Sequence, residues 1–388
     1  MSFFDTGISS YTGVSVWLEA HKQNEAEGEP ARDATAMERF GELTPAFTLQ
    51  TLLPLLVILL AFPAFSGERE NGTLRQVMSM QVSPVTLFFG KALGFSASLA
   101  VFIGPIIAIG LLGLFLVPEG RDFIGNALIL IVFYISYAMV FLFLTLSVSA
   151  NLKSSQSTLV AMVIFWAISS FVMPRIASDL SGLLYPTPAS VTFQKNIDEA
   201  IQAGLDGISP DTVIQQRQEQ MLKLYDVNTV EELPINFQGV IFDLTEKLGN
   251  RVFDKFYGEL NEIVSRQVSL FQAFSIVSPR MALQTASMEL SGTSINHHND
   301  FISQAEIYRR ALINQMNQDI IYNSQSGQAD YRAGPELWSS VKPFEYNQAD
   351  LTSIIISLGP SFVVMILWLG ISIVSGIIAV RRIKVTLT

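Results

Sequence analysis

The residues that could carry out chemistry in this chain are few. His297, His298 and Asp300 stand together and are of metal-ligand types. Neighbouring side chains on a helix point about 100° apart, so two such imidazoles rarely bind one ion, and we interpret the group as a solvated helix start. With no cysteine and three histidines in 388 residues, the sequence excludes disulfides and thiolate sites and disfavours a multi-histidine metal centre.

Two short motifs approach catalytic patterns but are incomplete. Gly90-Lys91 lacks the upstream glycine and the following Ser or Thr of a phosphate-binding loop. Ser96 lies in a pattern like that of a hydrolase serine, but the final glycine is missing and the surroundings are apolar, which favours helix packing. We therefore predict no catalytic residue, metal or cofactor in this chain. The net charge of −10 argues against a nucleic-acid partner.

The elements around these residues are dominated by long uncharged stretches. Only 15% of the residues are charged and 49% are hydrophobic, whereas soluble domains carry about 25% charge. Each of five stretches holds at least ~20 uncharged residues, the length of a helix that crosses a bilayer. These stretches lie between Glu42 and Glu68, Lys91 and Glu119, Asp122 and Lys153, Lys153 and Arg175, and Asp350 and Arg381. They predict five membrane-spanning helices.

Basic residues near the span ends predict the orientation. Lys and Arg concentrate in residues 66–91, around 150–155 and after 380, so the positive-inside rule puts these segments in the cytoplasm. The predicted organisation is therefore an exoplasmic N-terminal segment (1–44), transmembrane helices 1–4 with a cytoplasmic coupling loop at 66–91 (45–178), an exoplasmic domain (179–350), a last transmembrane helix (351–380) and a cytoplasmic tail (381–388).

The exoplasmic domain has the periodicity of helices. Apolar residues recur every three or four positions over 243–274, which predicts one long helix, and Pro279 suits the start of a second helix through Leu290. Asn299 or Asp300 is a candidate cap for a helix that reaches Tyr322, and Asp211 for a shorter one. No strand alternation is evident. The fold class expected is an all-α membrane protein: a helical transmembrane bundle with an inserted α-helical exoplasmic domain.

The five uncharged stretches contain no Asp, Glu, Lys, Arg or His. Transporters that use an ion gradient usually carry such groups inside the membrane, because intramembrane charges are costly and retained for function. Any energy for transport would then come from a partner. Between the first two spans, after a stop at 71–73, Leu74, Val77, Met78 and Gln81 give a short amphipathic helix that lies at the membrane surface. That helix is either an interfacial helix of no special use or a docking helix for a cytoplasmic partner.

The loop has a recognisable pattern. Glu68-Arg69-Glu70-Asn71-Gly72-Thr73-Leu74, followed by Pro84 and Gly90-Lys91, resembles the signature of ABC-2 type permeases. A second resemblance is to a domain of unknown function found in a bacterial subgroup of these permeases. It lies in Ser278-Pro279, Ala282-Leu283, Leu290-Ser291-Gly292-Thr293, His297-His298, Phe301, Ala305-Glu306, Tyr308-Arg309-Arg310 and Leu312.

The resemblance implies a permease subunit of an ATP-driven exporter in the bacterial inner membrane. ATP and Mg would be bound by a separate ABC ATPase subunit, and a second permease subunit, identical or a sibling, would complete the transporter. The ATPase-contacting residues implied are Glu68, Arg69, Glu70, Asn71, Gly72, Thr73, Leu74, Arg75, Val77, Met78 and Lys153. The alternative is a membrane-anchored receptor or assembly protein without transport activity. The sequence does not reveal the cargo.

The N-terminal segment departs from the resemblance. Family members normally begin with an additional span, which residues 1–44 do not contain, and these residues also lack the pattern of a signal peptide. We expect either that 1–44 is a translocated tail or that an upstream span precedes this chain, and the resemblance favours the second.

Overall fold

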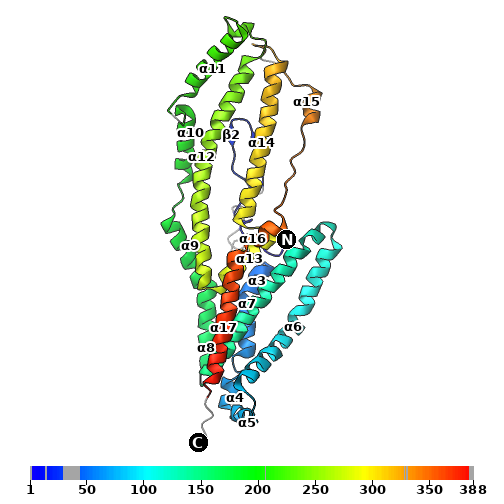
Figure 1. The fold of residues 1–388 in the computed structure, drawn as a ribbon, viewed down its shortest axis with the longest axis vertical. Helices are drawn as coiled ribbons and strands as arrows, with labels where there is room; N and C mark the ends of the chain where they lie inside the picture. Colours follow the sequence, from blue (N-terminus) through cyan, green and yellow to red (C-terminus); the bar gives the residue numbers. More distant parts are fainter. Residues whose placement is uncertain are drawn as a thin grey trace.

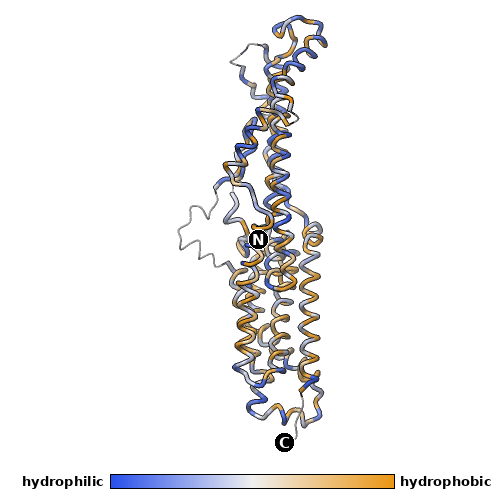
Figure 2. Tube along the Cα trace, turned by 90° about the vertical axis from the view of Figure 1, so that its left-hand side faces the viewer, coloured by the Kyte–Doolittle hydropathy of each residue, from blue (hydrophilic) through white to orange (hydrophobic). Residues whose placement is uncertain are grey.

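The computed structural model describes residues 2–13, 15–28, 44–205, 207–326, 328 and 331–383. The chain forms an elongated, nearly all-helical molecule with apolar helices at one end and more polar helices at the other (Figures 1 and 2). Residues 29–43 of the predicted N-terminal segment and 384–388 of the predicted tail lie outside the described residues.

Within the described part of the chain, five helical runs are long and apolar enough to cross a membrane, as predicted. The first run is α3 (Pro45–Ala61) with α4 (Ser66–Glu70), and the second is α6 (Pro84–Leu116). The third is η1 (Pro118–Phe123) with α7 (Ile124–Asn151). The fourth is α8 (Ser155–Ala167), η2 (Ile168–Val172) and α9 (Met173–Leu184), and the fifth is α17 (Gly359–Arg381). The predicted all-α membrane fold is confirmed.

Short polar side chains set where three of these helices begin. Thr44 accepts a hydrogen bond from the Phe47 amide, Ser83 from the Thr86 amide, and Ser154 from the Ser157 amide. Each bond satisfies one of the amides that a helix leaves free in its first turn. The span limits therefore follow from local sequence.

Helix α7 is the centre of the apolar bundle. It packs against α3, α6, α17 and α13 (Pro279–Ser291), and its Phe133, Tyr137, Phe141 and Leu142 are fully buried. Helix α6 lies at the outside (Figure 1) and leaves most of its apolar side chains exposed, among them Leu93, as expected for a lipid-facing helix.

The polar end, which we call the extension, consists of α10 (Ser190–Ala203), α11 (Pro210–Tyr225), α12 (Phe237–Ala273), α14 (Ile295–Asn323) and α15 (Pro335–Ser340). Short helices η3 (Val230–Glu232), η4 (Phe274–Ile276) and α16 (Leu351–Ser357) connect these elements. Helices α12 and α14 run antiparallel, because the Asn236 amide at the start of α12 donates to the Ile321 carbonyl near the end of α14. The long helix predicted from periodicity is thus present.

Several predicted helix starts were wrong by a few residues. Helix α12 begins at Phe237, not Asp243, and is capped by Asn236. Helix α14 is capped by Ser294 rather than by Asn299 or Asp300, and α11 by Ser209 rather than by Asp211. In each case an earlier Asn or Ser already satisfies the first-turn amides, so the later polar residue lies inside the helix.

The structure adds two features that periodicity did not predict. The N-terminal segment contains a minimal antiparallel hairpin, β1 (Leu18–Glu19) and β2 (Lys22–Gln23), whose two-residue strands are too short for a visible alternation. Helix α13, predicted as part of the exoplasmic domain, packs against α3, α7 and α17 and buries Leu283 and Leu290 in their common core. It joins the extension to the bundle.

Candidate partner-docking site at the loop end

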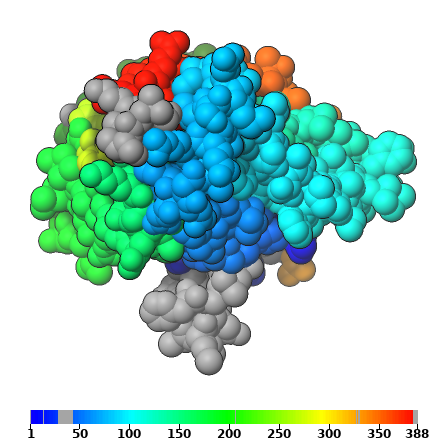
Figure 3. Space-filling view, turned by 90° about the horizontal axis from the view of Figure 1, so that it is seen from below, coloured from blue at the N-terminus to red at the C-terminus, as the bar shows by residue number. Residues whose placement is uncertain are grey.

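The predicted coupling loop forms a helical hairpin at the tip of the apolar bundle. We call α4, α5 (Thr73–Ser79) and residues 152–154 the loop end. It lies at the bottom of Figure 1 and at the centre of the face in Figure 3. Helix α4 ends at Glu70 with Asn71 as its C-cap, and Gly72 has φ 75°, a left-handed conformation that glycine adopts without steric cost. The predicted stop at 71–73 is confirmed.

Arg69 attaches the hairpin to the end of α7. Its guanidinium donates to the Ala150 carbonyl at 2.7 Å and also to the Leu152 carbonyl. These carbonyls belong to the last turn of α7 and the residue beyond it, where helical acceptors have no intrahelical partner. A cation there also complements the negative end of the helix dipole.

Glu70 attaches the hairpin to the beginning of α8. Its carboxylate accepts the Ser155 amide at 2.9 Å and the Ser155 hydroxyl at 2.7 Å. Ser155 is the first residue of α8, so an anion is placed where the helix dipole is positive. Arg69 and Glu70 therefore bind the two sides of the α7–α8 connection.

Glu68 attaches the hairpin to α6. Its carboxylate accepts the Lys91 ammonium at 2.6 Å, and the same ammonium lies 5.2 Å from the centroid of the Phe65 ring. The Lys91 side chain is only 15% exposed, so this ion pair is shielded more than a surface pair. Three consecutive charged residues thus fix the hairpin to the ends of three membrane helices.

Beneath the charged residues lies a small hydroxyl network that the sequence did not lead us to predict. The Ser149 hydroxyl accepts the amides of Phe65 and Ser66 at 3.0 and 3.1 Å and donates to the Phe62 carbonyl at 2.7 Å. The Thr158 hydroxyl donates to Ser66 Oγ at 3.3 Å. The available signal was the occurrence of Ser and Thr at the ends of apolar runs, where backbone groups need partners.

The residues implied as ATPase contacts fall into two groups. Leu74 is buried, Glu68, Arg69, Val77 and Met78 are half-buried, and Glu70 is exposed although its carboxylate binds Ser155. Asn71, Gly72, Thr73, Arg75 and Lys153 are exposed on the outer surface of the loop end. Lys153 follows Leu152, whose carbonyl accepts a hydrogen bond from Arg69. The exposed group therefore includes residues of the hairpin and of the α7–α8 connection. The first group positions the hairpin, and the second group lies on the surface that a cytoplasmic partner would meet.

The other sequence candidates have structural explanations. His297 Nδ1 lies 3.0 Å from Ser294 Oγ and 3.4 Å from the buried Glu289 carboxylate, within the first turn of α14. Burial lowers the pKa of His298. Among the described residues no group of three His, Cys, Asp or Glu side chains could hold a metal ion. The Ser96 hydroxyl donates to the Ala92 carbonyl within its own helix.

Sequence reasoning missed a buried charge network in the extension. The Arg309 side chain of α14 is 1% exposed and donates to Glu246 Oε1 at 2.6 Å, to Asn250 Oδ1 at 2.6 Å and to Glu306 Oε2 at 2.7 Å. It also donates to the Glu19 carbonyl in β1 at 3.1 Å. Arg309 therefore holds α12, α14 and the N-terminal segment together. Spacing alone could not reveal this, since the partners lie far apart in sequence.

The bundle also receives two ionisable residues from outside its spans. Arg280 of α13 is buried, donates to the Ser170 carbonyl in η2, and lies 5.8 Å from the Phe47 ring centroid. Asp5 accepts a hydrogen bond from Ser287 of α13, and burial raises the pKa of this carboxyl. The apolar runs carry no charge, but tertiary folding brings charge to their edge.

The fold and the loop end define a polytopic all-α membrane protein with a structured loop between its first two spans and a large helical extension. Residues 42–193 match the family model described as ABC-2 family transporter protein, and residues 198–347 match a domain of unknown function, DUF3526. The ABC-2 match includes the loop whose sequence resembles that of ABC-2 type permeases. No curated protein and no solved structure matches it.

Proposed function

We propose that this chain is the permease subunit of an ATP-driven ABC-2 exporter and that its loop end binds a separate ATPase subunit. The observation that carries the proposal is the attachment of the hairpin to α6, α7 and α8 through Glu68, Arg69 and Glu70. A hairpin fixed at three helix ends moves those helices whenever a partner moves it. The family match supports the same conclusion.

The fourth span offers a route from the loop end to the extension. It begins at Ser155, next to Glu70, and continues through α8, η2 and α9 to Leu184, where α9 packs against α12. The π-helical turn η2 interrupts regular packing at mid-span, and Arg280 donates to one of its carbonyls. Such turns often occur at functional sites. In the proposed mechanism, ATPase closure displaces the α8 start and the extension responds.

The proposal includes the remaining parts of the transporter. The loop end faces the cytoplasm of a bacterial cell, and the extension lies on the exoplasmic side of the inner membrane, in accordance with the positive-inside rule. ATP and Mg are bound by the ATPase subunit, and a second permease subunit completes the translocation path. This chain itself has no catalytic role.

The test separates docking from coupling. Thr73 is exposed at the loop end, so Thr73→Glu should remove the ATPase that co-purifies with the wild-type chain in mild detergent. Arg69→Gln should retain the ATPase but lower transport-coupled hydrolysis, because the hairpin loses its charged bonds to α7. Thr229→Glu at an exposed position in the extension is the matched control. Absence of any Walker-motif ATPase from the wild-type preparation would favour the receptor alternative.

A further inference from the structure

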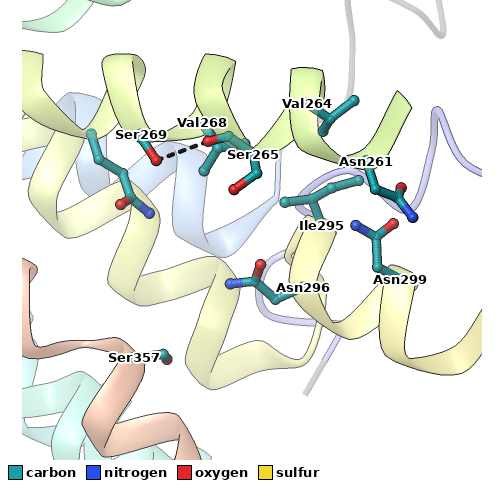
Figure 4. A pocket seen from close by; sticks show the side chains of 10 residues that line it. Asn261, Val264, Ser265, Val268, Ser269, Ile295, Asn296, Asn299 and Ser357 are labelled. Carbon is teal, nitrogen blue, oxygen red and sulfur yellow. Dashed lines mark hydrogen bonds between the residues drawn. The ribbon is translucent and has the colours of Figure 1, made fainter. Parts of the chain in front are cut away.

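A cavity of about 220 Å³ lies where the extension meets the apolar bundle, between α12, the first turns of α14, and α16 (Figure 4). It has room for about seven water molecules or one small cyclic group. Ser357 on its wall precedes Gly359, the first residue of the fifth candidate span, by two positions. The cavity is therefore level with one end of that membrane helix.

The α12 face that meets α14 is polar along much of its length. In the upper part, Asn250 and Asp254 accept hydrogen bonds from Arg309 and Arg310 of α14. Lower down, the same face continues through Asn261, Ser265 and Gln272 and opens on the cavity instead of on charged partners.

The amide groups around the cavity have unused hydrogen-bonding capacity. Within the described residues, the side chains of Asn261, Gln272 and Asn299 have no hydrogen-bond partner in the protein; Asn261 is exposed, and Gln272 and Asn299 are half-buried. Asn296 is held in place by Glu289 of α13 through its amide nitrogen at 2.5 Å. Each amide offers two donor hydrogens and an acceptor oxygen, so the wall can bind both donors and acceptors.

The chemistry of the wall excludes several ligand classes. The ten lining residues are Asn, Gln, Ser, Val and Ile, so no ionised side chain is present to bind an anion or a cation. Val264, Val268 and Ile295 supply a small aliphatic patch in a wall that is mostly polar. The three walls are helices, whose interior backbone groups are already paired, so an extended peptide would find no open edge to bind.

We propose that this cavity binds a neutral polyhydroxylated group of about one sugar ring, with its hydroxyls on the amides of Asn261, Gln272 and Asn299 and its C–H face on the aliphatic patch. The same chemistry is present in a free sugar and in the headgroup of a neutral glycolipid. The position beside the fifth span favours the glycolipid, because the headgroup would enter from the membrane surface. This inference does not depend on an ATPase partner.

The experiment measures binding to the full-length chain purified in detergent and reconstituted in nanodiscs. The probes are methyl glucoside in solution and monoglucosyl diacylglycerol in phosphatidylcholine nanodiscs, with an acetylated neutral tripeptide amide as the competing class. We expect saturable binding of the glycolipid and a loss of about tenfold in affinity in Asn261→Leu/Gln272→Leu, the equivalent of about 1.4 kcal/mol. Gln215→Leu, on exposed α11, is the matched control and should bind normally.

Each outcome decides between the alternatives. Binding of the glycolipid alone identifies a membrane-presented headgroup, and equal binding of methyl glucoside identifies a site for the sugar itself. Tighter binding of the tripeptide, no binding of either glycoside, or unchanged binding in the double variant would overturn the proposal. A normal thermal transition in the double variant shows that it is folded. ATPase co-purification is measured separately, so a failure here leaves the proposed function untouched.

Discussion

The adjacent residues Arg309 and Arg310 allow a direct comparison of a fully buried and a half-buried arginine in one helix turn. Arg309 is 1% exposed and pairs with Glu246, which is 6% exposed. Arg310 is 30% exposed and pairs with Asp254, which is 59% exposed, and with Glu306, which Arg309 also binds. Removing one member of a buried pair leaves an uncompensated charge and costs about 3–5 kcal/mol. A largely exposed pair contributes about 0.2–1 kcal/mol, because water and salt screen it.

Arg309→Gln is therefore expected to loosen the extension, and Arg310→Gln is the matched control. Hydrogen exchange of the full chain should accelerate about a hundredfold or more in α12 around Glu246 and in α14 around Arg309, since about 1.4 kcal/mol corresponds to a factor of ten. Arg310→Gln should change the same amides about fivefold or less.

The N-terminal segment provides an independent readout for this prediction. Arg309 donates to the Glu19 carbonyl, and the His21 amide donates to Glu246 Oε2 at 2.7 Å, so exchange in residues 15–28 should rise with that of α14. Similar exchange rates in the Arg309→Gln and Arg310→Gln proteins would refute the reasoning. They would mean that burial does not decide how much free energy of unfolding is lost when an ion pair is removed. Faster exchange in α14 without any change in 15–28 would refute the proposed link to the hairpin.

Two further predictions concern packing and pH. A β-carbon at Gly376 would overlap the ring of the buried Phe88, so Gly376→Ala should lower stability in detergent by about 1–3 kcal/mol. Gly370→Ala, in the same helix, is the control: its β-carbon meets nothing within 4 Å, so this change should be neutral or slightly stabilising. Equal melting temperatures for the two variants would contradict this prediction. Burial raises the pKa of Asp5 above its ordinary value, so its charged form opposes folding at neutral pH and the penalty fades as the pH falls through the raised pKa. Asp5→Asn, whose side-chain oxygen can still accept the Ser287 hydrogen bond, should be more stable than wild type at neutral pH, and this advantage should shrink in acid. A difference between the two melting temperatures that grows in acid would contradict the prediction.

Local sequence determined the membrane-spanning elements. A helix in hydrocarbon must satisfy its own backbone and avoid charge, so uncharged runs of sufficient length predicted the five candidate spans without knowledge of their contacts. The same holds for the turn at Gly72, where local conformation requires glycine. Capping residues were misassigned where two polar candidates preceded one helix, as with Ser294 and Asn299, because spacing cannot rank them.

The tertiary structure alone decided which way the charged residues point. Glu68, Arg69 and Glu70 share one pattern with Asn71 and Thr73, but the first three bind helix ends far along the chain, while the last two remain exposed.

The same is true of the extension and its cavity. The burial of Arg309, the insertion of α13 among the membrane helices and the amide-lined cavity each require helices that are distant in sequence. Periodicity records which side of a helix is apolar, because one helix alone sets that pattern. It carries no information on the distant segment that covers a given polar side chain, because that choice is made by the packing of the whole chain.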